Sequence, residues 1–220
     1  MFLKKTSLLL VGVVALLSAC SGESVEEQIH THLEETVTLE EGFKSQQGEI
    51  TDLEKQEQEI YSQIIDLGMD DLDEITKLSQ DALTIIDERK EELIIEKESI
   101  ASAQEEFQSI EELIEGIEEE ALKSKGKEMY ETMMSRYAAY EELYAAYMDS
   151  LEFEKELYTM LQDEELEQEA LNEHIAKINE SYETILAAND QFNKHTIAYN
   201  ELKKEFYEAA DMNVSFEEEA

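Results

Sequence analysis

The chain has 220 residues, of which 42% are hydrophobic and 33% are charged, and its 56 acidic residues against 17 basic ones give a formal net charge of −39. This acidity excludes bare nucleic acid as a partner, because neutralising phosphates requires a cationic surface. The chain contains no proline, seven glycines and one cysteine, a composition that predicts long uninterrupted helices and rules out an intramolecular disulfide.

The first 20 residues have the pattern of a bacterial lipoprotein signal peptide. Two lysines precede the apolar run 8–17, whose ten residues are too few to span a bilayer core of about 30 Å. The segment ends in a sequence that resembles a lipobox: Leu17, Ser18, Ala19 and Cys20. In lipoproteins of this kind a peptidase cleaves before the cysteine, whose thiol carries a diacylglyceryl group. We therefore expect residues 1–19 to be removed, and residues 20–24 to form a lipid anchor and short tether at the extracytoplasmic face of the cell membrane.

Beyond the tether, apolar residues recur at steps of three and four, which predicts a series of amphipathic helices. The first helix is expected over 25–67 with Gly68 as its C-cap, and the second over 72–121. A glycine and clustered lysines at 123–127 predict the next turn. The third helix is therefore expected over about 128–161.

The polar segment 162–165 is interpreted as a turn that precedes a fourth helix over 166–210. Four long helices joined by short turns predict an all-α fold, an elongated antiparallel up-and-down four-helix bundle over 25–210. If 162–165 continued the helix, the alternative would be a longer three-helix coiled-coil arrangement. The acidic tail 211–220 is expected to fray.

The predicted topology places three lysines at the same end of the bundle as the lipid tether: Lys123, Lys125 and Lys127. There they would contact anionic lipid headgroups, with about 1 kcal/mol of attraction for each lysine. The alternative is that they only cap the C-terminus of a helix, where the helix dipole favours positive charge.

A run of tyrosines and methionines in the third helix allows two interpretations. Tyr137 and Tyr144 are seven residues apart, and Tyr140 and Tyr147 repeat the same spacing, which is typical of core positions. The same four tyrosines would alternatively line a groove for a ligand or partner, because tyrosine and methionine make adaptable binding surfaces. The sequence leaves both interpretations open.

No residue pattern predicts a catalytic or metal site. Glu27 and His30 form a single Glu-x-x-His motif, whereas a di-iron site needs two copies on paired helices. The histidines are therefore expected at the surface or on helix flanks: His30, His32, His174 and His195. Cys20, the one cysteine, is taken by the acyl group, and no catalytic triad or phosphate-binding glycine loop is recognisable. We expect a protein that is not an enzyme and has no cofactor.

The lipobox, the near-uniform helicity, the acidic balance, the repeated Glu-Glu pairs and the tyrosine- and methionine-rich stretch 129–148 together resemble the YkyA-like family of Gram-positive cell-wall-binding lipoproteins. The resemblance covers essentially the whole mature chain and implies a four-helix bundle without catalytic residues. It predicts a membrane-anchored, non-enzymatic envelope lipoprotein that binds cell-wall polymer through bridging divalent cations, or that acts as a scaffold for envelope proteins. The alternative is a helical module that holds exported polypeptides or a ligand.

Overall fold

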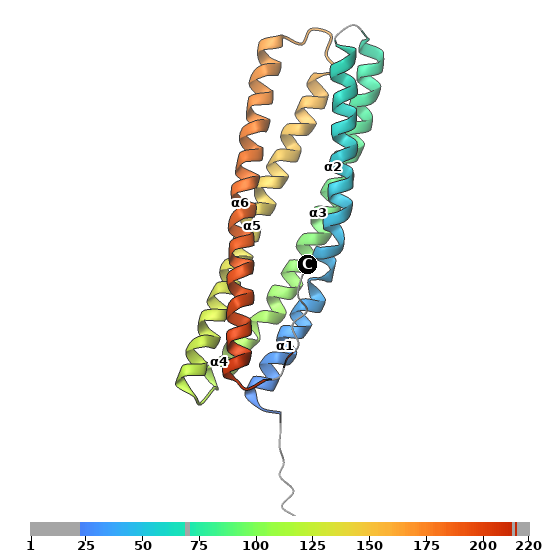
Figure 1. Cartoon of the computed structure of the whole chain (residues 1–220). Coiled ribbons are helices and arrows are strands. Elements are labelled where there is room, and N and C mark those ends of the chain that lie inside the picture. The colour runs from blue at the N-terminus through green and yellow to red at the C-terminus, as the bar shows by residue number, and fades with distance from the viewer. Residues whose placement is uncertain (1–22, 69–70, 213, 215–220) are drawn as a thin grey trace, which may run out of the picture.

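The computed structural model describes residues 23–68, 71–212 and 214, and these residues form an all-α fold (Figure 1). The lipobox and Cys20 lie outside the described residues, as does most of the acidic tail. The helices are α1 (Val25–Leu39), α2 (Glu41–Leu67), α3 (Leu72–Gln108), α4 (Ile110–Glu115), α5 (Glu120–Met160) and α6 (Gln168–Ala209). Within the described residues, no helix is both long and apolar enough to cross a membrane.

The first helix begins with a capping box. The Ser24 hydroxyl accepts a hydrogen bond from the Glu27 backbone N–H at 3.2 Å, and the Glu27 carboxylate accepts one from the Ser24 N–H at 2.8 Å. These two bonds satisfy backbone donors that have no partner within the helix. The acid of the single Glu-x-x-His motif is therefore used to start α1.

The helices form two hairpins that lie side by side in an elongated molecule (Figure 1). In one hairpin α1 and α2 follow each other and pack antiparallel against α3, and in the other α5 packs along α6. The two hairpins meet chiefly through α3 and α5. Residues 161–167 form a turn, so the four-helix bundle is confirmed over the three-helix alternative.

The turn predicted at 123–127 is wrong. The chain turns at 116–119, and α5 begins at Glu120, so the three lysines lie in the first turns of that helix. Gly126 is buried inside α5, where an added Cβ would lie 3.2 Å from Ile114 and 3.3 Å from the ring of Phe206. Its glycine therefore allows three helices to approach closely and does not end a helix.

The core consists of two clusters that follow one another along the long axis. One cluster is built around Phe107, Tyr137 and Phe206, near the N-terminus of α1, the 116–119 turn and the C-terminus of α6. The other is built around Ile86 and Tyr158 and extends towards the turns that follow α2 and α5. We call these the proximal and distal halves, because the predicted anchor at residue 20 precedes α1.

Candidate functional site

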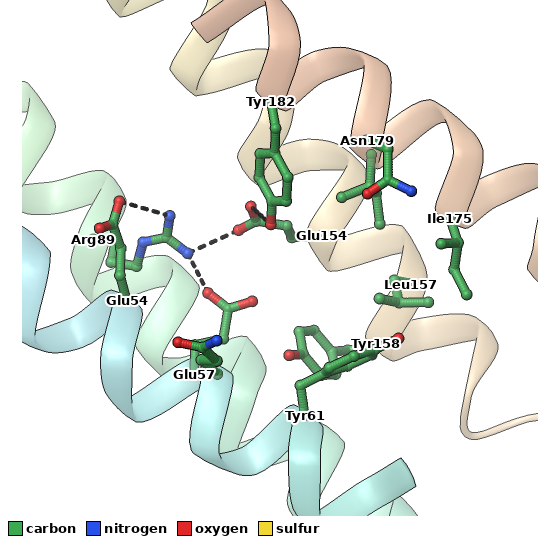
Figure 2. A pocket seen from close by; sticks show the side chains of 12 residues that line it. Glu54, Glu57, Tyr61, Arg89, Glu154, Leu157, Tyr158, Ile175, Asn179 and Tyr182 are labelled. Atoms are coloured by element: carbon green, nitrogen blue, oxygen red, sulfur yellow. Dashed lines mark hydrogen bonds and ion pairs between the residues drawn. The ribbon is translucent and has the colours of Figure 1, made fainter. Parts of the chain in front are cut away.

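A cavity of about 370 Å³ lies in the distal half, where α2, α3, α5 and α6 come together (Figure 2). Charged and aromatic side chains replace the aliphatic ones expected in the middle of a helical bundle. Glu57 and Tyr61 come from α2, Arg89 from α3, and Glu154 and Tyr158 from α5. The apolar part of the wall is supplied by α5 and α6. The site therefore joins both hairpins.

Arg89 is the centre of the polar network. One of its terminal nitrogens, Nη1, donates to Glu57 and, at 2.8 Å, to Glu154, while Nη2 donates to the Tyr147 hydroxyl at 2.7 Å. Burial would lower the pKa of this guanidinium, but Glu154, Tyr147 and Glu57 raise it above its ordinary value. The arginine, which is 5% exposed, is therefore a permanent buried positive charge.

Glu154 is the more completely satisfied of the two buried carboxylates. Besides Arg89, it accepts hydrogen bonds from the Ser150 hydroxyl at 3.2 Å and from the Tyr182 hydroxyl at 2.8 Å. The side chain is only 2% exposed. Three donors on one carboxylate hold it in a fixed orientation.

Glu57 has a different environment, in which the pKa of its carboxyl group is raised to near neutral pH. Burial, followed by the like charge of Glu154, raises the pKa of Glu57 from 4.5 to about 7, although Arg89 and a hydrogen bond from Tyr158 act in the opposite direction. Glu57, Glu154 and the more exposed Glu54 all pair with one guanidinium, so the two buried carboxylates alone leave one excess negative charge when both are ionised. A buried charge of this kind is costly unless something compensates it.

The network is also incomplete at its centre. Among the described residues, Nε of Arg89 is one of two buried side-chain polar atoms without a hydrogen-bond partner, and the other is the Ser79 hydroxyl. Most buried polar groups in folded proteins have a partner, and an unpaired guanidinium donor is unfavourable. The polar cluster is therefore not a closed structural ion pair.

The structure divides the four tyrosines predicted as core or groove. Tyr137 and Tyr140 are fully buried in the proximal core and donate their hydroxyls to Glu40 at 3.4 Å and Glu96 at 2.9 Å. Tyr144 is half-buried between the two core clusters. None of the four lines the cavity, but Tyr147 contacts it indirectly, through its hydrogen bond with Arg89.

The three lysines at the start of α5 are engaged in ion pairs. Lys123 and Lys127 pair with Glu115 at 3.3 and 2.5 Å, and Lys125 pairs with Glu205 at 2.5 Å. Lys123 also donates to the backbone carbonyl of Glu115 at 2.6 Å, at the end of α4. This last bond matches the capping alternative, and contact with lipid headgroups stays a prediction.

The histidines do not form a site. His174 is buried and its Nε2 lies 2.7 Å from the backbone carbonyl oxygen of Phe153, so its predicted surface position is wrong. His30 and His32 are half-buried beside Tyr207 and Glu106, and His195 is half-buried on α6. In the part of the chain that the structure describes, no three histidine, cysteine, aspartate or glutamate residues are grouped to hold a metal ion.

The cavity is not among the features expected from the sequence, although the sequence contains a signal for it. The chain has only two arginines, Arg89 and Arg136, and each follows a buried apolar residue by three positions and precedes another by four. For Arg89 these neighbours are Ile86 and Leu93. An arginine at a core position of an amphipathic helix indicates a buried charge.

Three similarities to known proteins were found. Residues 24–209 match the model of a family described as "Putative cell-wall binding lipoprotein". The "Uncharacterized lipoprotein YkyA" of Bacillus subtilis (strain 168) is 33% identical over 199 residues, which cover 90% of this chain and 89% of that protein. A crystal structure of a conserved protein of unknown function from Staphylococcus aureus aligns with a TM-score of 0.75 at 18% identity, over 82% of this chain and 91% of that one, which supports the fold alone.

Proposed function

The chain belongs to the YkyA family of lipoproteins, and on this premise we propose that it is a membrane-anchored, non-enzymatic protein of the cell envelope that binds a wall component or an envelope partner through its distal half. The anchor in this proposal is the diacylglyceryl group on Cys20. The binding site is the cavity between the two hairpins.

The observation that carries the proposal is the distance between the tethered end and the cavity. The N-terminus of α1 follows the anchor directly, whereas Tyr61 and Tyr158 lie near the far ends of α2 and α5. At 1.5 Å per residue, the helical path from residue 25 to residue 57 is roughly 50 Å long. A site at that distance faces away from the membrane, where the wall and other envelope proteins are found.

The charge of the chain constrains how a wall polymer would be held. With 56 acidic residues against 17 basic ones, the exterior repels anionic polymers at short range. Divalent cations would bridge the two, or the partner itself would be cationic. Wall binding is therefore expected to depend on Mg²⁺ or on a basic group of the partner.

The test is retention of the mature protein, residues 20–220 in nonionic detergent, on purified cell-wall sacculi. Sacculi with and without their anionic polymers are compared, each with Mg²⁺ and with a chelator. We expect retention that the chelator weakens when anionic polymers are present. Absence of retention under all four conditions, together with no protein crosslinked in cells, would contradict the proposal.

A matched pair of variants assigns any retention to the cavity. Asn179 is exposed on α6 at the edge of the cavity, and Asn193 is exposed on the same helix away from it. Asn179→Trp would obstruct the opening with a large ring without disturbing the core. We expect it to lower retention, while Asn193→Trp leaves retention unchanged.

Exposed apolar side chains on α6 favour a second candidate, a holder of exported polypeptides. Leu186 is 68% exposed and Ile197 is 62% exposed, on the helix that also carries Tyr182 at the cavity. In this candidate, the two side chains would bury apolar groups of an unfolded chain, which is favourable in water. This candidate predicts that the protein slows aggregation of a reduced secreted protein and that Leu186→Lys removes this effect.

A further inference from the structure

We propose that the cavity between the hairpins binds an organic cation, a primary ammonium group on a short apolar stem, with the charge facing Glu57 and Glu154 and the stem lying against Leu157. This inference rests on the proposed function, because it takes the same cavity as the binding site. It adds the chemical class of the ligand.

The charge of the residues that line the cavity favours a cationic ligand over an anionic one. Three carboxylates, those of Glu54, Glu57 and Glu154, line the cavity together with a single cation, Arg89. The terminal nitrogens of the guanidinium donate to Glu57, Glu154 and Tyr147, so its positive charge is already compensated by carboxylates, although Nε has no hydrogen-bond partner. An anion entering here would meet two buried carboxylates in a region of low dielectric constant. A cation would instead compensate the excess negative charge.

The direction of the Glu57 side chain provides the contact. One carboxylate oxygen is bonded to Arg89, and the second points away from it, towards Tyr158 and the open centre between the helices (Figure 2). The hydroxyl of Tyr158 donates a hydrogen bond to Glu57, and Tyr61 also lines the cavity (Figure 2). Aromatic faces attract ammonium groups, and the attraction is stronger in a desolvated site. A cavity lined by this carboxylate and by two tyrosine side chains therefore matches an ammonium head group.

The apolar residues that line the cavity favour an apolar stem on the ligand, and the volume of the cavity limits the size of the ligand. Leu157, Ile175 and Ile178 form an apolar surface from α5 and α6. Burying a few methylene groups against this surface would strengthen the binding of the ligand. A cavity of about 370 Å³ is at the small end of ligand sites, so it suits a small amine or one side chain.

The opening of the cavity lies between α2 and α6. Three of its lining residues are exposed to solvent: Gln58 on α2, and Asn179 and Tyr182 on α6. The two amide side chains each offer a carbonyl oxygen that can accept a hydrogen bond from an ammonium group. An amine attached to a longer chain, such as the lysine side chain of a peptide, would enter here with its backbone left outside.

Binding of a cation would have a characteristic proton linkage. The pKa of Glu57 is about 7, so below neutral pH much of the carboxyl group is protonated. An ammonium group beside it favours the carboxylate, and binding at pH 6 would therefore release a proton. The affinity is expected to rise between pH 6 and pH 8, in the range where neither a primary amine nor an exposed carboxylate titrates.

The experiment is isothermal titration calorimetry of the mature protein, residues 20–220 in nonionic detergent. The small probes are n-pentylammonium, pentanoate and 1-pentanol, which share one stem and differ in charge. A Gly-Lys-Gly peptide and its Nε-acetylated form test an ammonium group carried on a polypeptide. We expect binding of n-pentylammonium and of the unmodified peptide, with proton release at pH 6 that is measured in buffers of different ionisation enthalpy.

Two variants of α2 make the assignment to Glu57 specific. Glu57→Gln removes the carboxylate of the site, and Glu59→Gln removes the same charge from the exposed face of the helix. We expect the first to weaken n-pentylammonium binding at pH 8 by at least tenfold and to abolish proton release at pH 6. The second should bind as the wild type does. Thermal melts of both variants establish that they are folded.

The outcomes separate this inference from the proposed function. Ammonium binding without retention on sacculi or any envelope partner would support the inference and contradict the proposed function. Retention on sacculi without ammonium binding would overturn the inference alone. Equal binding by Glu57→Gln, or tighter binding of pentanoate, would also overturn it. If the acetylated peptide binds as well as the unmodified one, the lysine side chain is excluded as the source of the ammonium group.

Discussion

At the scale of single residues, the two buried arginines illustrate two different uses of charge. Arg136 donates to both carboxylate oxygens of Glu40, at 2.7 and 2.8 Å, and its Nε donates to Thr196 at 3.0 Å. One cation and one anion in this bidentate geometry form a balanced pair. Arg89 faces two buried carboxylates and a cavity, which structural pairing alone does not require. The comparison within one molecule supports a binding role for the Arg89 cluster.

The pH dependence of stability should depend on Glu57. Its folded-state pKa of about 7 lies above its ordinary value of 4.5, so the folded protein holds a proton that the unfolded chain releases. The resulting stabilisation is complete below pH 4.5 and is lost as the pH rises to 7. A shift of this size corresponds to about 3 kcal/mol.

Urea unfolding of the wild type and of Glu57→Gln at pH 5 and pH 8 measures this contribution. We expect the stability of the variant, relative to the wild type, to increase by roughly 2–3 kcal/mol between the two pH values. The exposed Glu59→Gln is the control, and its pH dependence should match that of the wild type. Parallel pH profiles for the wild type and Glu57→Gln would show that the carboxyl group does not retain its proton in the folded state.

The residues of the site could be predicted only in part from the sequence. The core position of Arg89 is visible because Ile86 and Leu93 flank it at helical spacing. Its partners are not visible, because Glu57 and Glu154 are 32 and 65 residues away and any of 56 acidic residues could have been chosen. The register between helices selects the pair, and that register depends on packing across the whole core.

At the scale of helices, a helix end that is set by the residues at that position could be predicted from the sequence. A helix break that depends on contacts with another helix could not. Gly68 ends α2 as expected. The interruption between α1 and α2 depends instead on Ser99 of α3, whose hydroxyl donates to the Leu39 carbonyl at 2.6 Å and accepts from the Phe43 N–H at 3.0 Å. Gly126 likewise serves close packing rather than a turn. Local sequence does not distinguish these cases.

Gly48 inside α2 and Gly68, the C-cap of that helix, should respond oppositely to replacement by alanine. Gly68 has φ 62° and ψ −156°, a conformation essentially restricted to glycine, so Gly68→Ala should destabilise the protein by about 1–3 kcal/mol. Gly48 lies inside the helix with nothing within 4 Å of an added Cβ, so Gly48→Ala should stabilise it by about 0.5–1 kcal/mol. Urea unfolding of the pair measures both changes. A change of the same sign in both variants would contradict the assigned helix end.

At the scale of the whole molecule, the antiparallel topology could be predicted because long helices joined by short turns must reverse direction at each turn. The error at 123–127 shifted one turn by a few residues and left the order of helices intact. Because of that order the two ends of the molecule differ: α1 begins at one end, and the cavity lies towards the other. In the proposed function, access of a partner to the cavity would depend on which end is attached to the membrane.

The attachment is tested by Cys20→Ser, which removes the thiol that would carry the diacylglyceryl group. Two acyl chains give stable membrane anchoring at about 0.8 kcal/mol for each buried methylene, and the hydroxyl of serine cannot form the thioether. All described helices begin after residue 24, so the variant should melt as the wild type does. We expect it to lose the lipid mass on its N-terminal peptide and its anchored position in membrane fractions, whereas Ser21→Ala should retain both. A lipidated Cys20→Ser protein would place the anchor elsewhere and remove the basis for calling the cavity end distal.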